Sequence, residues 1–406
     1  MLSAQTIKVI KSTVPVLEVH GQAITKRFYE MMFSNHPELL NIFNHAHQKQ
    51  GRQQTALANS VYAAAKHIDE LEKILPVVKQ IGHKHRSLGV KAEHYPIVGE
   101  HLLMAIKDVL GDAATEEIIQ AWAEAYGVIA QVFIDVEKEM YEETEHQEGG
   151  WAEFRTFFVD KKVQESKVIT SFYLKPRDGQ MVSSFLPGQY ISVKIKDSND
   201  EYTHIRQYSL SDSPGKSHYR ISVKREQGKD LPDGKVSNYL HDQINEGDTL
   251  EISAPAGDFT LDMSSRLPVV LISGGVGITP MMSMLQTLVE SQSEREVTFI
   301  HAAINGDYHA MRDDVENLAV DHKNVKSFFC YEAPTEKDRV DGKFDKEGYI
   351  DLAWLKEILP SNEADFYFCG PLPFMKAIRQ ALLDWNVPQE NIHFEFFGPA
   401  VDLDQA

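Results

Sequence analysis

The stretch His204–Ser211, in the middle of the chain, carries the side chains with the clearest chemical potential. Its alternating pattern predicts a strand with one face turned inward. Arg206 offers a planar fork for anions, Tyr208 an aromatic plate and Ser209 a small hydroxyl donor, with Gln207 between the first two. Such a set suits a ligand that combines a flat ring system with phosphate. Taken alone, it is more typical of an ordinary polar-faced strand, and the surrounding motifs favour the binding interpretation instead.

Other motifs surround this strand in a fixed order. Phe185–Tyr190 forms a turn that leads into a second predicted strand beginning at Tyr190, and Pro255–Phe259 forms a later turn. Gly234–Asn238 predicts the start of a helix, whose N–H groups and the Ser237 hydroxyl could face a pyrophosphate.

A glycine-rich turn follows the apolar strand Val269–Ser273 and precedes a helical pattern. It consists of Gly274, Gly275, Val276, Gly277, Ile278, Thr279 and Pro280. Glycines allow a backbone to approach a pyrophosphate closely, and the helix N-terminus supplies donors. The spacing is not that of the Rossmann G-x-G-x-x-G motif, and a tight turn without ligand is the alternative.

These motifs, in this order, resemble the ferredoxin-reductase-like flavoprotein family. The resemblance implies that Tyr190, the Arg206–Ser209 strand and Ser237 bind FAD, and that the glycine turn binds a nicotinamide dinucleotide. It also implies a second dinucleotide-facing loop and a tail near the flavin ring. The loop is Cys369, Gly370 and Pro371, and the tail is Glu395, Phe396, Phe397, Gly398 and Pro399. Because no Lys or Arg occurs between Ala302 and Asp307, we expect NADH to be favoured over NADPH.

His85 is the candidate metal ligand of the N-terminal third. It continues an apolar row with a spacing of three or four residues, formed by Leu71, Leu75, Val78, Ile81 and Leu88. A histidine on such a face is more often a core residue than a ligand. Gln53 and Leu57 lie one helical turn apart and so face one cavity, near which we expect Tyr29 and Phe43.

This set is similar to the globin family. The resemblance implies haem b with His85 as the proximal iron ligand, Phe43 packed on the haem, and Tyr29, Gln53 and Leu57 above it. Tyr95 and Glu137 match residues that form a network with the proximal histidine in bacterial globins joined to reductases. A helix-start tyrosine and a surface glutamate are the plain alternatives.

A globin followed by such a reductase resembles the flavohaemoglobin family over essentially the whole chain. The resemblance implies a nitric oxide dioxygenase: NAD(P)H reduces FAD, FAD reduces the haem iron, and haem-bound oxygen converts NO to nitrate. Tyr29, helped by Gln53, would hydrogen-bond the oxygen, and Leu57 would restrict the pocket. Lys84 and Glu395 would tune the redox potentials or the contact between domains, and a solvated surface charge is the plain alternative for both. The alternatives are a reductase of external flavins, quinones or ferric complexes, and a haem-based oxygen or NO sensor.

Three kinds of element are needed to position these residues. The chain is helical in pattern to about Tyr141, then shows short alternating strands, and after Pro268 alternates buried strands with helices. We therefore predict an all-α globin domain at 1–141, a linker at 142–150, an antiparallel β-barrel FAD domain at 151–264 and a parallel α/β NAD(P)H domain at 265–406.

The amino-acid composition limits the possible partners and the cellular compartment of the protein. The 406 residues are 42% hydrophobic and 25% charged, with a net charge of −19, which disfavours nucleic acid and anionic membranes as partners. Cys330 and Cys369 cannot form a disulfide framework, and the sequence has neither a signal-peptide pattern nor a membrane-length apolar run. We expect a cytoplasmic monomer.

Overall fold

The computed structural model describes residues 2–398 apart from 44–47, 49–50, 199 and 229–232. The chain forms two compact units. The first contains residues 1–154 and 194–206, and the second contains residues 155–193 and 207–406.

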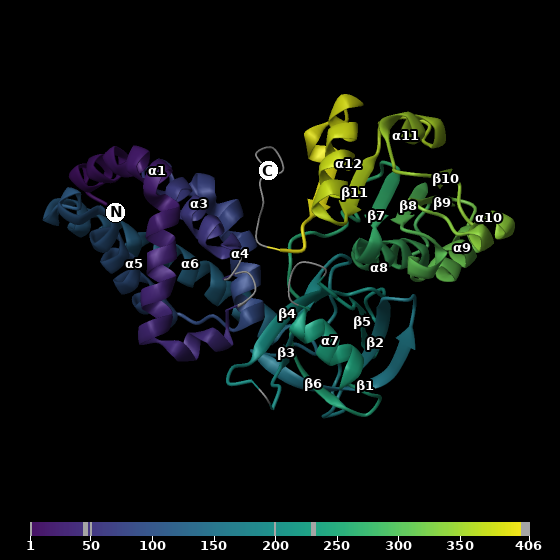
Figure 1. The fold of residues 1–406 in the computed structure, drawn as a ribbon, viewed down its shortest axis with the longest axis horizontal. Helices are drawn as coiled ribbons and strands as arrows, with labels where there is room; N and C mark the ends of the chain where they lie inside the picture. The colour runs from purple at the N-terminus through teal and green to yellow at the C-terminus, as the bar shows by residue number, and fades with distance from the viewer. Residues whose placement is uncertain (1, 44–47, 49–50, 199, 229–232, 399–406) are drawn as a thin grey trace. The chain divides into compact units, whose positions relative to one another are not determined.

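The N-terminal part of the first unit is helical, as predicted (Figure 1). Its elements are α1 (Ala4–Asn35), η1 (Pro37–Asn41), α3 (Arg52–Lys66), η2 (Leu71–Ile74), α4 (Leu75–Leu88), α5 (His94–Leu110), η3 (Gly111–Ala113) and α6 (Glu116–His146). The Ser3 side chain caps α1 by accepting from the backbone N–H of Thr6. Helix α6 continues through Glu142–His146, the first half of the stretch predicted as a linker. Glutamate is a good helix former, so an acidic run need not end a helix.

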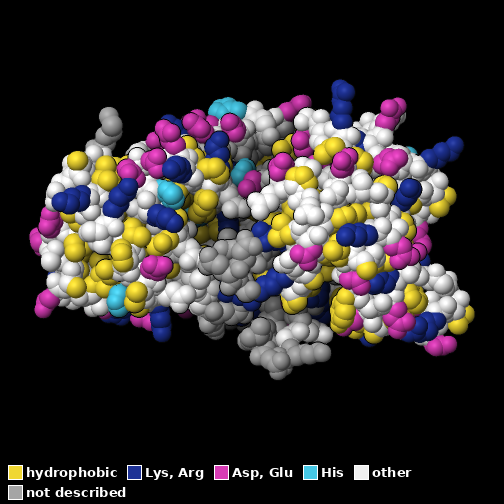
Figure 2. Space-filling model, turned by 90° about the horizontal axis from the view of Figure 1, so that it is seen from above, with side chains coloured by type: hydrophobic (Ala, Val, Ile, Leu, Met, Phe, Trp, Pro, Cys, Tyr) yellow, Lys and Arg dark blue, Asp and Glu magenta, His cyan; other side chains and the backbone are white. Residues whose placement is uncertain are grey.

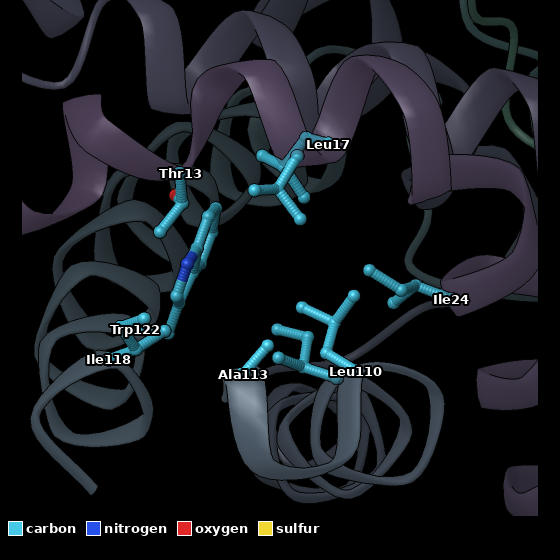
Figure 3. Close-up of a pocket in the computed structure, with 9 residues that line it drawn as sticks. Thr13, Leu17, Ile24, Leu110, Ala113, Ile118 and Trp122 are labelled. Atoms are coloured by element: carbon cyan, nitrogen blue, oxygen red, sulfur yellow. The ribbon is translucent and has the colours of Figure 1, made fainter. Parts of the chain in front are cut away.

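A small cavity of about 50 Å³ lies between α1, α5, η3 and α6 (Figure 3). Leu17, Ile24, Leu110 and Trp122 line it. The hydroxyl of Thr13, which also lines it, donates to the carbonyl of Ile10, so the cavity is an apolar packing defect rather than a site for polar chemistry.

The β-rich middle of the chain forms an antiparallel sheet with strand order β4-β3-β6-β1-β2-β5. Its strands are β1 (Phe154–Gln164), β2 (Ile169–Pro176), β3 (Tyr190–Ile195), β4 (His204–Ser209), β5 (Tyr219–Lys224) and β6 (Thr249–Ser253), with α7 (Lys235–Asp242) between the last two. An isolated bridge from Leu210, just after β4, to Ile221 in β5 links the two outer strands. This linkage agrees with the predicted barrel architecture.

The C-terminal part is a parallel α/β layer structure, as predicted, with strand order β10-β9-β8-β7-β11-β12. The strands are β7 (Val269–Gly274), β8 (Val297–Ala303), β9 (Val325–Tyr331), β10 (Lys346–Glu347), β11 (Asp365–Cys369) and β12 (Ile392–Glu395). The α-helices are α8 (Ile278–Glu290), α9 (Arg312–Asp321), α10 (Glu336–Asp341), α11 (Leu352–Ile358) and α12 (Leu372–Asp384). One core packs α8 and α9 against the sheet and another packs α11 and α12, on opposite faces (Figure 1). The carboxyl ends of the strands therefore form one edge, where ligands bind in such folds.

The surface carries acidic, basic and hydrophobic side chains interspersed over the face seen in Figure 2. Within the described residues, no helix has the length and apolar character needed to cross a membrane.

Candidate functional site

His85, Tyr95 and Glu137 come together although they lie on three different helices, α4, α5 and α6. The Nδ1 atom of His85 is 2.7 Å from the buried carboxylate of Glu137 and 3.3 Å from the Tyr95 hydroxyl. The Tyr95 hydroxyl donates to the same carboxylate oxygen over 2.6 Å. Burial, and then the charge of Glu137, raise the pKa of Tyr95, so the phenol keeps its proton.

This network determines which nitrogen of His85 can bind a metal. An ionised carboxylate only accepts hydrogen bonds, so Nδ1 carries the proton and the lone pair is on Nε2. The His85 side chain is one-third exposed, whereas Glu137 is almost fully buried. A buried carboxylate behind an accessible imidazole is the arrangement that proteins use to orient a metal-binding histidine. The residues present therefore fit haem iron at His85.

Tyr29, on α1, lies within an aromatic cluster and is buried. Its ring stacks on Phe33 at 5.6 Å and meets Phe43 edge-on at 5.9 Å, measured between ring centroids. The half-buried Leu57 of α3 packs against the same core. The predicted group of Tyr29, Phe43 and Leu57 thus shares one region of the helical unit.

Gln53 lies near enough to Tyr29 to act on the pKa of its hydroxyl, and so does a second amide, that of Gln48. The Gln48 side-chain Nε2 also donates to Gln53 Oε1 over 2.9 Å. Burial raises the pKa of Tyr29, and the hydrogen bonds from Gln48 and Gln53 oppose this increase. The sequence reasoning missed Gln48 because it lies outside any periodic pattern.

The Arg206–Ser209 motif lies on β4, as predicted. Gln207 Nε2 donates to Ser192 Oγ on the neighbouring β3 over 3.0 Å, which fixes the register of the two strands at this point. Arg206 and Tyr208 are half-buried, whereas Ser209 is buried and its hydroxyl oxygen has no hydrogen-bond partner among the described residues. A buried hydroxyl without a partner is costly, and a ligand phosphate or ring would satisfy it.

Two further predicted flavin residues lie in the same part of the chain. Tyr190 pairs with Ala256 through an isolated bridge, and its ring covers Gly257, where a side-chain carbon would come within 3.0 Å of it. Ser237, at the start of α7, accepts from the N–H of Glu226 and donates to the carbonyl of Gly234. Its hydroxyl is therefore used to hold the loop that precedes the helix.

The glycine turn has the geometry that its sequence predicts. Gly275 has φ +55° and open space around the position of a side chain. A side-chain carbon at Gly277 would lie 2.1 Å from the carbonyl oxygen of Cys369. Gly275 thus leaves room above the turn, and Gly277 lets the turn pack directly on the end of β11. Val276 is half-buried, while Ile278 and Thr279 are buried at the start of α8.

The Cys369 loop and the C-terminal tail meet at the same edge of the sheet. In the strand register, Cys369 pairs with Ser273 on one side and with Glu395 on the other. Gly370 and Pro371 follow Cys369 directly, and Phe396, Phe397 and Gly398 follow Glu395. Burial raises the pKa of the Cys369 thiol well above its ordinary value. Pro399, the last predicted residue of the tail, lies outside the described residues.

Lys84, a predicted redox-tuning residue, precedes His85 on α4, and its side chain is half-buried.

Three family models match the chain in consecutive segments. They are Globin at residues 26–133, Oxidoreductase FAD-binding domain at 156–261 and Oxidoreductase NAD-binding domain at 271–380.

Full-length relatives share this order of segments. The chain is 65% identical to a flavohemoprotein of Bacillus anthracis over 403 residues, covering 99% of this chain and 100% of the relative. It is 58% identical to the flavohemoprotein of Bacillus subtilis over 406 residues, covering all of both chains. The chain belongs to the flavohaemoprotein family. It is therefore an oxidoreductase that contains haem, FAD and NAD(P)-binding sites.

Solved structures agree with this assignment. A flavohemoglobin from Malassezia yamatoensis, with bound FAD and heme, matches 98% of this flavohaemoprotein and 100% of its own chain, with 29% identity and a TM-score of 0.84. The FAD/NAD-binding domain of a nitric oxide dioxygenase from Vibrio cholerae is 40% identical and covers 60% of this chain and 99% of its own, with a TM-score of 0.55.

Proposed function

We propose that this flavohaemoprotein is a nitric oxide dioxygenase. It would convert two NO and two O₂ into two nitrate ions while NAD(P)H gives up two electrons and a proton is released. The observation that carries the proposal is the pairing, within one helical unit, of a carboxylate-backed imidazole with a buried tyrosine that lies near two amides. The reductase family models in the same chain, and the nitric oxide dioxygenase named above, support it.

On the proximal side, Glu137 and Tyr95 hold the His85 ring in one orientation and keep the proton on Nδ1. A negative charge next to the N–H makes the imidazole a stronger electron donor to a metal at Nε2. We assign Glu137 and Tyr95 to this task. The carboxylate distinguishes the site from one that only binds oxygen reversibly through a neutral partner.

On the distal side, Tyr29 would donate its hydroxyl proton to oxygen as negative charge develops, with Gln53 in support. Phe43 and Leu57 pack against the same core as Tyr29, and their apolar side chains would exclude water and limit the room for ligands. An apolar pocket with a few placed donors favours NO and O₂ over charged or bulky molecules.

The remaining predicted site residues would bind the cofactors that deliver electrons to the haem. When bound, FAD accepts a hydride from NAD(P)H and releases electrons singly, and the haem iron binds oxygen. We propose that Tyr190, Arg206, Gln207, Tyr208, Ser209 and Ser237 hold the flavin, and that the Gly274–Thr279 turn and Cys369–Pro371 hold the dinucleotide. Glu395–Pro399 would line the flavin ring, and Lys84 and Glu395 would adjust the redox potentials.

Several finer points belong to the proposal. We propose NADH as the preferred donor, because Ala302–Asp307 contains no Lys or Arg to bind a 2′-phosphate. We keep 1–141, 151–264 and 265–406 as the functional domains, since each encloses one matched family segment. A cytoplasmic monomer is supported by the two buried, free cysteines and by the presence of every cofactor segment in one chain.

The deciding experiment measures NO consumption by the purified holoprotein with NADH and oxygen, followed by a nitrate assay. Wild type should form nitrate only with oxygen, and Tyr29→Phe should slow nitrate formation by about 10–100-fold because it removes one preorganised donor. Tyr349→Phe is the matched control, since that tyrosine is 70% exposed and lies in the C-terminal sheet region.

Two other outcomes would reassign the function. NADH oxidation that continues with external flavins or ferric complexes after haem loss, without nitrate formation by the holoprotein, would make the chain a reductase of external acceptors. Nitrate formation at the wild-type rate in Tyr29→Phe would keep the activity and remove Tyr29 from it.

A further inference from the structure

Helix α4 ends three residues after His85, in a cap that is hydrogen-bonded to His85 itself. Gly89 has φ +80°, the left-handed conformation that ends many helices, and its N–H donates to the carbonyl of Arg86 over 3.1 Å. The N–H of Val90 donates to the carbonyl of His85 over 3.0 Å. These two bonds form a Schellman motif, and Gly89 and Val90 are the α4 cap. The backbone of His85 is therefore held in part by Val90.

Tyr141 of α6 holds this cap. Its hydroxyl donates to the carbonyl of Val90 over 2.8 Å, and a longer contact of 3.4 Å reaches the carbonyl of Arg86. Burial, and then the charge of Glu137, raise the pKa of the half-buried Tyr141. The phenol thus keeps its proton and can donate to a backbone carbonyl, which only accepts.

Tyr141 and Glu137 lie on one face of α6. They are four residues apart, about one helical turn, so their side chains leave the helix in similar directions. Glu137 contacts Nδ1 of His85 at 2.7 Å, while Tyr141 contacts the α4 cap. Gly82 lets the two helices approach closely, because a side-chain carbon there would lie 3.1 Å from the sulfur of Met140. One helix face thus holds both the ring and the backbone of the same histidine.

We propose that Tyr141 is a positioning residue for His85, which it keeps in contact with Glu137 and in place for haem iron by holding the α4 cap. Release of the cap would let the end of α4 move away from α6 and weaken the contact between Nδ1 and the carboxylate. The imidazole would then donate less electron density to a metal at Nε2. Within the proposed function, the inference rests only on His85 as the haem ligand and not on NO chemistry.

Tyr141→Phe in the haem-loaded full chain removes the hydroxyl alone. Haem transfer to an apo-globin acceptor should accelerate by about three- to tenfold, the factor that corresponds to one ordinary hydrogen bond. The iron–histidine stretching band of the ferrous form, measured by resonance Raman spectroscopy, should move to lower frequency, and the haem midpoint potential should rise. Both shifts have the direction expected for Glu137→Gln, because each variant weakens the effect of the carboxylate on the imidazole.

Thr6→Val is the matched control. The buried Thr6 hydroxyl donates to Glu124 Oε2 over 2.7 Å and so ties α1 to the same helix α6. Glu124 lies 17 residues before Tyr141, about 25 Å along the helix axis. Thr6→Val should lower the thermal unfolding temperature to an extent similar to Tyr141→Phe, but it should leave the iron–histidine band and the midpoint potential at wild-type values.

Gly89→Ala tests the α4 cap independently of Tyr141. A side-chain carbon at Gly89 would lie 3.8 Å from the Phe154 ring, an ordinary contact, so the substitution strains the backbone without a clash. It should shift the iron–histidine band in the same direction as Tyr141→Phe. The double variant should change haem transfer by less than the product of the two single factors, because both substitutions act through one cap.

Two results would overturn the inference. One is a haem-loaded Tyr141→Phe that loses stability as Thr6→Val does while its band and haem transfer stay at wild-type values, which would leave Tyr141 a purely structural residue. The other applies if Tyr141→Phe does not retain haem: Gly89→Ala then decides, and a wild-type band in that variant would remove the link between the cap and His85, whereas a shifted band would support it.

A nitrate assay separates this inference from the proposed function. A protein that makes no nitrate but shows the shifts in haem transfer and in the iron–histidine band would retain the role of Tyr141 and lose the dioxygenase assignment. A protein that makes nitrate, with Tyr141→Phe and Gly89→Ala indistinguishable from wild type in both haem measurements, would retain the activity and lose the role of Tyr141.

Discussion

Two imidazoles of this molecule, His85 in the helical unit and His301 in the C-terminal sheet, show how a partner decides what a histidine does. The Nδ1 atom of His85 faces the carboxylate of Glu137 at 2.7 Å, and one-third of its side chain is exposed. The Nδ1 atom of His301 faces the Ser273 hydroxyl at 2.8 Å, and the residue is fully buried.

The residues around His301 also differ from those around His85. Its ring lies 4.4 Å from that of His309, whose Nδ1 is 2.9 Å from the Tyr331 hydroxyl. Both Nε2 atoms are buried without a partner in the described part of the chain. Burial lowers the pKa of His301 to about 3, so this pair stays neutral and serves packing. The carboxylate partner leaves the His85 imidazole oriented and accessible, as a metal ligand must be, whereas hydroxyl partners and burial keep His301 and His309 in the core.

The largest effect should follow from removing the charge behind His85. Glu137→Gln keeps the size and an acceptor but makes the partner neutral, as it is at His301. Loss of such a partner typically costs about 10–100-fold in metal affinity or activity, so haem should dissociate faster and the haem midpoint potential should rise. Haem transfer to an apo-globin acceptor and a spectroelectrochemical titration measure the two. Glu139→Gln, an exposed neighbour on α6, is the control, and equal behaviour of the two variants would show that the charge is irrelevant.

The next effect concerns stability in acid. The folded-state pKa of His301, about 3, lies below the ordinary 6.5, so the unfolded chain binds the proton more readily. Its stabilising contribution is complete above about pH 6.5 and falls as pH drops from there toward 3. The loss should reach about 2 kcal/mol at about pH 5 from this residue alone.

Urea unfolding of the C-terminal part at neutral and mildly acid pH measures that loss. His301→Gln should flatten the pH dependence whatever its effect on absolute stability, because the variant has no imidazole to titrate. An unchanged slope would mean that other groups dominate acid unfolding.

The same comparison shows which features of the sites could be predicted from sequence alone. The apolar row through His85 predicted which side of its helix packs inward. The motifs also predicted that Arg206–Ser209 lies on a strand and that Gly274–Pro280 forms a turn between a strand and a helix. These predictions were possible because hydrophobic period and glycine content reflect local backbone geometry. Nothing local indicated that His301 would be buried beside His309, or that Gln48 would reach Tyr29. Those contacts depend on how separate elements pack. The local sequence around an amide or imidazole is the same whether that side chain is buried against another element or exposed to solvent.

Some element boundaries were also harder to predict from the sequence. The acidic stretch after Tyr141 was expected to be a linker, yet α6 extends to His146. Strand β6, Thr249–Ser253, was not predicted, because five residues between turn signals carry too little pattern. Local helix propensity carries α6 through the acidic run, whereas β6 depends on the distant strands beside it in the sheet.

The smaller of the two effects on the haem should come from Tyr95→Phe. The Tyr95 hydroxyl donates to Glu137 over 2.6 Å, and it is only the second contact of His85 Nδ1, at 3.3 Å, so the carboxylate can still hold the ring without it. Glu137 would lose one charge-assisted donor in a buried place, which should cost about 1–3 kcal/mol of stability. The freed charge should act more fully on His85 and lower the haem midpoint potential, opposite in sign to Glu137→Gln. Thermal unfolding and the same redox titration check both, with Tyr62→Phe as a control on α3. If both variants moved the potential in the same direction, Tyr95 would act on His85 directly rather than through the carboxylate.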